Sequence, residues 1–155
     1  KCYIDKNKIP NFKKTFDRDL FNTFLTYFDF NNFFPLHLKQ NKDNRGSFYE
    51  NIKSKNECQV SFSTTLPGKT RGNHYHTRKL ERFTVIKGKA QIDFRKIGSS
   101  KKFSFFLDGD SPSFVDMPIW HTHNIKNIGN DVLYTVFWIN EFFDENDPDT
   151  FFEKV

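Results

Sequence analysis

Two histidines separated by a single residue are the clearest candidates for chemistry in this sequence. His74 and His76 lie in the segment GNHYH, and Glu81 follows five residues after the second. Side chains at positions i and i+2 of a β-strand project from the same face, so these imidazoles should lie side by side. A hairpin after His76 would bring the carboxylate of Glu81 back toward them. A second pair, His121 and His123, follows in the segment WHTHN.

Imidazole and carboxylate side chains arranged in this way are suited to holding a divalent metal. Neutral histidine nitrogens and ionised carboxylate oxygens bind zinc, iron, manganese and nickel. Three imidazoles and one carboxylate would supply four ligands. Since a histidine must lose its proton before it binds a metal, affinity should weaken below about pH 6.

The elements that must position these residues are mostly strands. Residues 11–28 repeat apolar side chains every three or four positions, which predicts an amphipathic helix. Later segments alternate apolar and polar residues between turns, and they predict strands at residues 47–52, 59–66, 81–88, 90–97, 102–107, 113–117 and 131–139. Strands at this spacing predict a sandwich or small barrel. Residues 141–155 predict an irregular tail that packs back on the barrel.

Composition and charge exclude several classes of protein. The chain has 155 residues and a net charge of +5, but its lysines and arginines are scattered, so we expect no nucleic-acid partner. No apolar run is long enough to span a membrane, and the first residues lack the apolar core of a signal peptide. Cys2 and Cys58 form no CxxC pattern, which favours the reducing cytoplasm.

The residues around the histidines resemble the two conserved motifs of the cupin family. The matching positions are Gly68, His74, His76, Glu81 and Gly88 in the first motif, and Gly109, Pro118, His123 and Asn127 in the second. The resemblance implies an all-β fold, a double-stranded jelly-roll barrel, preceded here by a short helical segment. It also implies four metal ligands, His74, His76, Glu81 and His123, with Zn²⁺ as the expected ion. Trp120 stands where the second motif usually has glycine, and a left-handed backbone there would be strained.

Longer segments resemble a narrower group of cupins. Residues 43–50, 71–76, 122–129 and 147–155 are similar to the C-terminal cupin of the bifunctional capsular polysaccharide enzymes of the CapF or WbjC family. These are related to the dTDP-4-dehydrorhamnose 3,5-epimerases. The resemblance implies a cupin domain at residues 31–155. Residues 1–30 would be the helical tail of an upstream short-chain reductase domain, whose active-site motifs this chain lacks. We therefore expect a fragment, or the product of a split or degraded gene.

The family resemblance also implies a reaction and a set of site residues. The cupin would epimerise C3 of a UDP-2-acetamido-2,6-dideoxy-4-hexulose during synthesis of N-acetyl-fucosamine-type sugar nucleotides for capsule or O-antigen. Arg71 and Arg45 would hold the UDP-linked 4-keto-6-deoxy sugar. His74 resembles the base of the metal-free epimerases, but it can act as base only without metal. With metal bound, His121 is the candidate base, because it shares a strand face with His123. Tyr134, Tyr49 and Tyr75 are candidates for the acid. The metal is either a Lewis acid or structural. The expected partners are a second copy of the chain and a separate reductase domain.

Two other functions remain open at the level of sequence. Three histidines and a glutamate also hold iron in cupin dioxygenases, which would consume oxygen. Alternatively, the chain is a non-catalytic cupin that binds a sugar nucleotide or supports dimerisation. Such a module would bind its ligand without exchanging the proton at C3.

Overall fold

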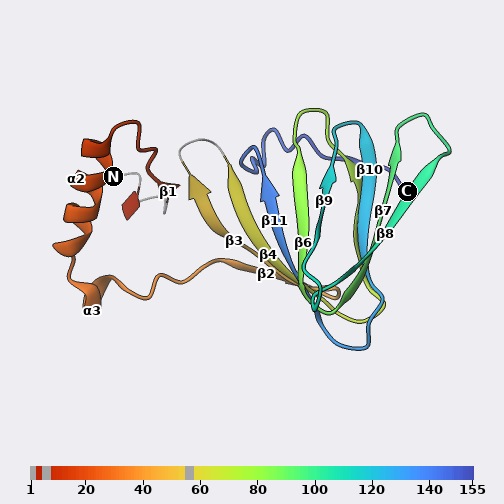
Figure 1. The fold of residues 1–155 in the computed structure, drawn as a ribbon, viewed down its shortest axis with the longest axis horizontal. Helices are drawn as coiled ribbons and strands as arrows, with labels where there is room; N and C mark the ends of the chain where they lie inside the picture. Colours follow the sequence, from red (N-terminus) through yellow and green to blue (C-terminus); the bar gives the residue numbers. More distant parts are fainter. Residues whose placement is uncertain (1–2, 5–7, 55–57) are drawn as a thin grey trace.

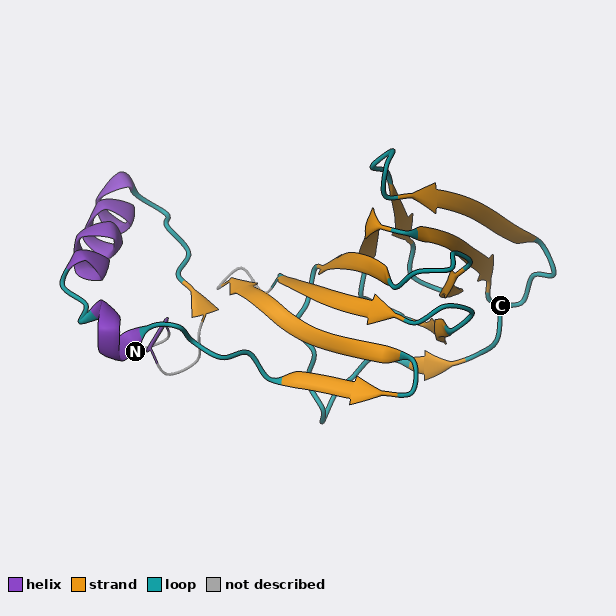
Figure 2. Cartoon of the chain, turned by 90° about the horizontal axis from the view of Figure 1, so that it is seen from below, coloured by secondary structure: helices purple, strands orange, loops and turns teal. Residues whose placement is uncertain are grey.

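The alternating segments of the sequence form strands that assemble into two facing β-sheets (Figure 1). The computed structural model describes residues 3–4, 8–54 and 58–155. A helical segment lies beyond one end of the sheets, next to the short strand β1, and an extended stretch connects it to them (Figure 2). Within the described residues, no helix is both long enough and apolar enough to cross a membrane.

The larger sheet has seven strands. Its order is β1 (Lys8–Ile9), β3 (Gly46–Ser54), β4 (Gln59–Thr65), β11 (Leu133–Ile139), β6 (Glu81–Lys87) and β9 (Phe114–Met117), with β2 (Gln40–Asp43) paired to β3. All pairs are antiparallel except the two-residue pairing of β1 with β3. Each predicted strand of this sheet is present.

The smaller sheet has five strands and carries three of the histidines of interest. Its order is β12 (Phe151–Phe152), β5 (Thr70–Tyr75), β10 (His121–Asn127), β7 (Lys89–Lys96) and β8 (Lys102–Asp108). The chain crosses repeatedly between the sheets, because β5 and β6 are consecutive but belong to different ones. The predicted all-β, two-sheet architecture is therefore confirmed.

The space between the sheets has an apolar part and a polar part. The buried apolar side chains are Phe83, Val85, Ala90, Ile92, Leu107, Met117, Ile125 and Leu133. By contrast, the inward positions of β4 are all polar: Gln59, Ser61, Ser63 and Thr65, each at most 3% exposed. Burying polar groups contributes far less than burying hydrocarbon. The apolar core is consequently small for a chain of this length.

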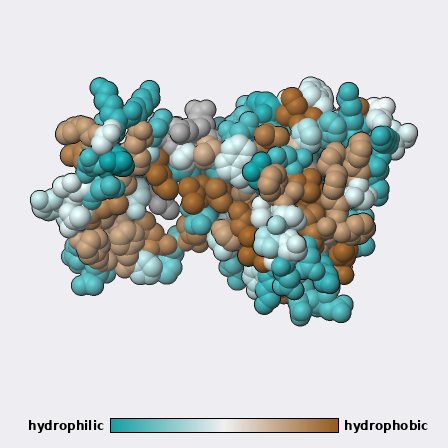
Figure 3. All heavy atoms as spheres, in the orientation of Figure 1, coloured by the Kyte–Doolittle hydropathy of each residue, from teal (hydrophilic) through white to brown (hydrophobic). Residues whose placement is uncertain are grey.

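The predicted helix forms at α2 (Thr15–Thr26), and a short second helix follows at α3 (Phe30–Phe33), across the predicted boundary at residue 30. Tyr3, Phe21 and Phe28 make aromatic contacts within this segment. No residue of α2 is buried, and Phe16 is 71% exposed. Brown apolar surface is accordingly visible over the helical segment (Figure 3).

Among the described residues, Cys58 is not in a disulfide. Cys58 is a free, half-buried thiol whose Sγ lies 2.9 Å from the hydroxyl of Ser54. Cys2 lies outside the described residues.

Candidate metal centre

Pairing of β5 with β10 brings the histidines of the two motifs together. His74 lies opposite His123 in the register of the two strands. The register shifts just beyond this pair, where Gly72 has φ of +97°. A Cβ at Gly72 would lie 2.7 Å from the carbonyl oxygen of His123, so only glycine lets the strands approach this closely. Gly72, two residues before His74, is therefore needed for the pairing of β5 with β10.

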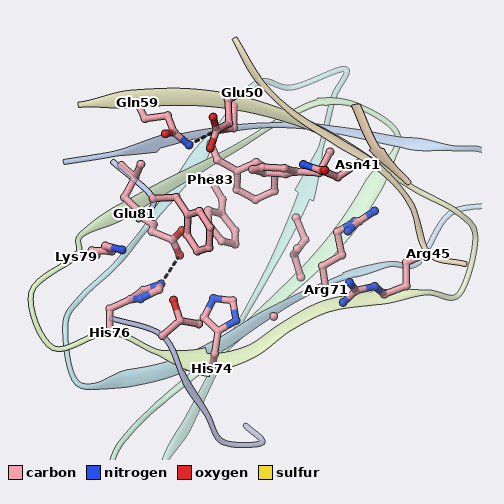
Figure 4. A pocket seen from close by; sticks show the side chains of 18 residues that line it. Asn41, Arg45, Glu50, Gln59, Arg71, His74, His76, Lys79, Glu81 and Phe83 are labelled. Atoms are coloured by element: carbon pink, nitrogen blue, oxygen red, sulfur yellow. Dashed lines mark hydrogen bonds and ion pairs between the residues drawn. The ribbon is translucent and has the colours of Figure 1, made fainter. Parts of the chain in front are cut away.

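All four predicted ligands converge on one point between the sheets. Their ligand atoms lie within 4.8 Å of one another, which allows them to hold a metal ion. Nε2 of His123 lies 2.9 Å from Oε2 of Glu81, and Nε2 of His76 lies 3.3 Å from the same oxygen. The ring of His74 completes the group, at 4.8 Å from the ring of His123. Figure 4 shows His74, His76 and Glu81 turned toward a common space.

Burial and charge shape the titration of this cluster. Burial and, to a smaller extent, neighbouring His123 lower the pKa of His74 to about 4. Burial lowers the pKa of His76, but the charge of the Glu81 carboxylate, 3.3 Å from its Nε2, and the carbonyl oxygen of Asp149 outweigh burial and raise this pKa. The pKa of Glu81 is far below its usual value, because the nearby imidazoles of His123 and His76 overcome the effect of burial. The carboxylate is therefore charged, and at least one imidazole is neutral, at neutral pH.

One buried atom of the cluster points directly to a missing partner. Nε2 of His76 is inaccessible to solvent and has no hydrogen bond of acceptable geometry to any described residue. An unsatisfied buried nitrogen is costly in a folded protein. A metal ion accepts the lone pair of such a nitrogen, and three imidazoles with one carboxylate are appropriate ligands for zinc. The residues present fit a divalent metal.

The raised pKa of His76 gives metal binding a defined pH dependence. Protons compete with the metal for this imidazole below its pKa, whereas His74, with a pKa of about 4, is already neutral. In the metal-free protein, the stabilisation from protonated His76 is present below the unfolded-state pKa of about 6.5 and is lost as pH rises through the higher folded-state value. We therefore expect the rise in Tm caused by Zn²⁺ to widen from pH 5.5 to pH 8. A constant rise in Tm over this range in calorimetry would contradict the assignment.

A central cavity of about 510 Å³ opens beside the cluster. β3 and β4 form one wall, with Glu50 and Gln59, and the other wall contains His74 on β5 and His76 just after β5 (Figure 4). The volume is typical of a site for a small organic ligand.

The two predicted substrate-binding arginines line this cavity, away from the histidines (Figure 4). Arg71 is largely buried, with its side chain 13% exposed, and its Nη2 donates to the carbonyl oxygen of Thr64 at 3.2 Å. Arg45 is more exposed and its Nε donates to Asp43 at 2.9 Å. The hydrogen bond from Arg45 is the main reason that the pKa of Asp43 falls to about 2. Together the side chains form a positively charged end of the cavity.

The structure does not bring the predicted base and acid into the cavity. His121 precedes His123 on the same face of β10, but its Nδ1 lies 2.9 Å from the carbonyl oxygen of Ile119 and its ring packs against Phe94. Tyr134 is 41% exposed on β11, between the buried residues Leu133 and Thr135, and so faces outward. Neither side chain is among the residues that line the cavity.

Several cavity residues were not predicted as site residues from the sequence. Glu50 lines the wall formed by β3, and Gln59 and Ser61 line the wall formed by β4. Lys79 lies in the loop before Glu81; its side chain is 1% exposed and its Nζ donates to the carbonyl oxygen of Pro148 at 2.6 Å. The only signal in the sequence was the run of polar residues at alternate positions of β4.

Trp120 adopts the left-handed backbone that the cupin motif normally assigns to glycine, with φ of +59°. The turn keeps its hydrogen bonds, since Trp120 N–H donates to the carbonyl oxygen of His76 at 2.7 Å. Its indole stacks on Tyr75, with ring centroids 5.9 Å apart. This contact compensates for part of the strain.

Replacing Trp120 by glycine should therefore change stability little. Relief of the left-handed conformation contributes about 1–2 kcal/mol, whereas the lost stacking costs about 0.5–1.5 kcal/mol and the added chain entropy about 0.5–1 kcal/mol. We expect urea unfolding of Trp120→Gly to stay within about 1 kcal/mol of the parent. Tyr75→Leu is the comparison variant. It removes the stacking on Trp120 and also that on Phe151, and it leaves the strain, so it should be the less stable variant.

Comparisons with known proteins place the chain in a family. A family model described as the polysaccharide biosynthesis C-terminal domain matches residues 41–151. The chain belongs to this family. Within the family, the chain is 39% identical over 138 residues to UDP-2-acetamido-2,6-beta-L-arabino-hexul-4-ose reductase from Pseudomonas aeruginosa, covering 86% of this chain and 36% of the reductase.

Solved structures agree with this membership. The capsular polysaccharide assembling protein CapF from Staphylococcus aureus superposes with a TM-score of 0.92 at 39% identity, covering 99% of this chain and 42% of CapF. The oxalate decarboxylase of Lactobacillus farciminis shares the fold alone, with a TM-score of 0.57 at 18% identity over 67% of this chain and 31% of that one. The predicted cupin fold and the resemblance to the CapF family are confirmed. The chain spans about two-fifths of the length of these family relatives.

Proposed function

We propose that the chain is a metal-dependent epimerase acting at C3 of a UDP-2-acetamido-2,6-dideoxy-4-hexulose, in the synthesis of N-acetyl-fucosamine-type sugar nucleotides for capsule or O-antigen. The observation that carries the proposal is a single cavity with four candidate metal ligands on one side and two arginines at its far end. The Pseudomonas relative supports the substrate class, because its name specifies a UDP-linked 4-keto sugar.

The cavity offers complementary groups to the two ends of such a substrate. The guanidinium groups of Arg71 and Arg45 suit the diphosphate, because each can donate two parallel hydrogen bonds. With the diphosphate at that end, the hexulose ring extends toward His74 and Glu81. The buried amide of Gln59 lies along the same wall as Glu50 and is available to the sugar.

Epimerisation at C3 needs a proton removed from one face of the ring and returned to the other. The C3–H bond breaks, its electron pair enters the C4 ketone as an enolate, and a new C3–H bond forms on the opposite face. A divalent metal held by His74, His76, Glu81 and His123 would act as a Lewis acid toward the developing negative charge. We propose Zn²⁺ as that metal.

We place the proton-abstracting base at Glu50 rather than at His121. Glu50 lines the wall opposite the histidine-bearing strand β5, whereas His121 and Tyr134 do not line the cavity. Its carboxylate is ion-paired with Lys53 and its side chain is 29% exposed, so it is accessible from the cavity. His74 keeps the role of base only in a metal-free enzyme, where its depressed pKa leaves it neutral.

The contribution of Arg71 can be measured as ligand affinity. Its guanidinium is held by backbone carbonyl groups of β3 and β4 and does not have to be ordered when ligand binds. Charge-assisted hydrogen bonds contribute about 1.5–3 kcal/mol each, so Arg71→Ala should weaken UDP binding by about 10- to 100-fold in calorimetric titration. Arg71→Lys should not restore affinity, since an ammonium cannot reproduce the fork. Arg45→Ala should weaken UDP binding less than Arg71→Ala, because Arg45 is more exposed. Equal losses of affinity would show that burial does not make Arg71 the more important residue.

Solvent exchange tests the proposed reaction. The protein is incubated in D₂O with the UDP-linked 4-keto-6-deoxy sugar, with and without a chelator, and deuterium at C3 is followed by NMR. We expect exchange that the chelator abolishes and added Zn²⁺ restores. Exchange that survives complete metal removal would make the metal structural. Shifted ligand signals without exchange would instead identify a non-catalytic binding module.

We also propose that the chain functions as a homodimer and alongside a separate reductase domain. The reductase would reduce the C4 ketone once C3 has been inverted. In this proposal residues 1–30 are a helical segment and residues 31–155 a cupin, and α2 supports the arrangement because its apolar face contains no buried residue. Analytical ultracentrifugation of the purified chain, alone and mixed with a reductase domain, tests both proposals. The chain alone should sediment with the mass of a dimer, and the mixture should contain a larger complex.

A further inference from the structure

The C-terminal segment is attached to the loop that joins two of the candidate ligands. This loop, residues 77–80, connects His76, which directly follows β5 of the smaller sheet, to Glu81, the first residue of β6 in the larger sheet. Asp149 lies against it with only 3% of its surface exposed. A carboxylate this deeply buried needs strong hydrogen-bond donors to remain charged.

The loop supplies those donors from consecutive backbone groups. The carboxylate of Asp149 accepts the N–H groups of Thr77, Arg78 and Lys79 at 3.0–3.1 Å, and also the hydroxyl of Thr77. Successive N–H groups that converge on one anion form a nest, which fixes the conformation of the loop. Burial raises the pKa of Asp149, but these bonds outweigh it and lower the pKa to about 2. The carboxylate is therefore a permanent anchor for the loop.

The same residue also contacts a candidate ligand through its backbone. The carbonyl oxygen of Asp149 lies 2.5 Å from Nδ1 of His76. Because a carbonyl oxygen only accepts, the imidazole must donate from Nδ1, which leaves the lone pair on Nε2. That Nε2 is the atom that points at Glu81 and lacks a hydrogen-bond partner among the described residues. Asp149 thus determines both which tautomer His76 adopts and which way its ring faces.

Other contacts hold this segment in place over the strands that carry the remaining histidines. Lys79 donates its Nζ to the carbonyl oxygen of Pro148, next to Asp149. Phe152 in β12 lies opposite His74 in β5. The hydroxyl of Thr122, next to His123, donates to the carbonyl oxygen of Glu153. The C-terminal segment is therefore fixed to the neighbourhood of all four candidate ligands.

We propose that Asp149 is a positioning residue of the metal centre. Its carboxylate sets the loop between His76 and Glu81, and its carbonyl group presents Nε2 of His76 to the metal. The inference rests on the proposed metal site but not on the proposed epimerisation. Partners of this kind, which act on a metal through its ligands, typically account for a 10- to 100-fold change in metal affinity.

Variants at Asp149 distinguish the contribution of its carboxylate to metal binding from that of its backbone conformation. The residue has φ of +42°, so Asp149→Gly keeps this backbone without strain and removes the carboxylate. Asp149→Asn removes the charge and keeps one oxygen, which can still accept from Thr77 or from Arg78 and Lys79, while its NH₂ group cannot accept from the others. Asp147→Ala is the control, because Asp147 lies on the same segment and pairs with Arg78 but is exposed. The dissociation constant for Zn²⁺ is measured by competition with a chelator, and Tm is measured on the metal-free proteins.

We expect Asp149→Gly to weaken Zn²⁺ binding by about 10- to 100-fold. Asp149→Asn should weaken it measurably, but by less than Asp149→Gly, and Asp147→Ala should leave it unchanged. The absorption spectrum of the Co²⁺-substituted protein should change in Asp149→Gly, because the ligand geometry changes. If Asp149→Gly only lowers the Tm of the metal-free protein and binds Zn²⁺ like the parent, the residue is merely structural and the inference is wrong. Should that variant fail to fold, an unchanged affinity in Asp149→Asn together with an unchanged Co²⁺ spectrum overturns it equally.

The parent protein distinguishes this inference from the proposals on which it rests. A parent that binds Zn²⁺ but does not exchange the C3 proton would refute the epimerase and leave the role of Asp149 intact. A parent that binds no divalent metal would refute the metal centre itself, and the positioning role with it.

Discussion

Replacing Glu50 by glutamine is expected to slow deuterium exchange at C3 of the 4-keto sugar by about 10²- to 10⁴-fold, the range that a positioned general base contributes. The amide keeps the shape of the side chain and cannot accept the proton. Zn²⁺ affinity should stay at the value of the parent, because Glu50 belongs to the wall opposite β5 and is not one of the four candidate ligands. The initial rate of exchange, followed by NMR at saturating substrate, is the measurement.

Lys53→Ala provides the matched control for this variant. It breaks the ion pair between Lys53 and Glu50 but leaves the carboxylate in the cavity. Exchange in Lys53→Ala should remain within about tenfold of the parent, since only the position of the base is loosened. If both variants slow exchange equally, the ion pair matters rather than the base. If Glu50→Gln exchanges at the parent rate while His121→Gln does not, the base is His121 after all.

Removing the carboxylate of Glu81 should have the largest effect on metal binding. Its oxygen is the point on which His76 and His123 converge, and its pKa is depressed well below the usual range by these contacts. Glu81→Gln keeps the volume of the side chain but removes the single negative charge among the four ligands. We expect Zn²⁺ affinity to fall by more than about 100-fold, beyond the loss caused by groups that only contact ligands.

The prediction for Glu81 is checked by metal analysis after dialysis and by chelator competition. Asp116→Asn is a suitable control, since this carboxylate lies on the neighbouring strand β9 and pairs with Arg82 at the surface. The control should retain its metal. If Glu81→Gln retains the metal content of the parent, the histidines alone hold the ion and Glu81 is not a ligand.

The metal cluster could be predicted from the sequence because its signals are local or belong to a known pattern. His74 and His76 are two residues apart on one strand, so the period of a β-strand places them together. The position of Glu81 follows from the short loop after His76, and the position of His123 from the second cupin motif. The strands were predictable for the same reason, since alternation along each segment reflects one buried face.

The groups that surround the cluster could not be predicted, because their contacts join distant parts of the chain. Asp149 contacts the loop at Thr77, although the two residues are 72 positions apart in the sequence. His121 shows the limit of the face argument. It is two positions from His123 and therefore on the same face of the strand, but it lies at the beginning of β10 and its ring packs against Phe94. Alternation along a strand predicts which face of the sheet a side chain lies on, but it does not predict how far along the strand the cavity extends.

The polar inward face of β4 affects how stable the protein is and therefore how much of it a cell retains. In the part of the chain that the structure describes, eight apolar side chains are buried in the core, so hydrophobic burial leaves a narrow margin of stability. A ligand at 1,000 times its dissociation constant adds about 4 kcal/mol to that margin. Unfolded chains are removed by proteases, and a change of this size alters abundance several-fold. We therefore expect metal starvation to deplete the protein by degradation, so that its amount reports the zinc supply of the cell.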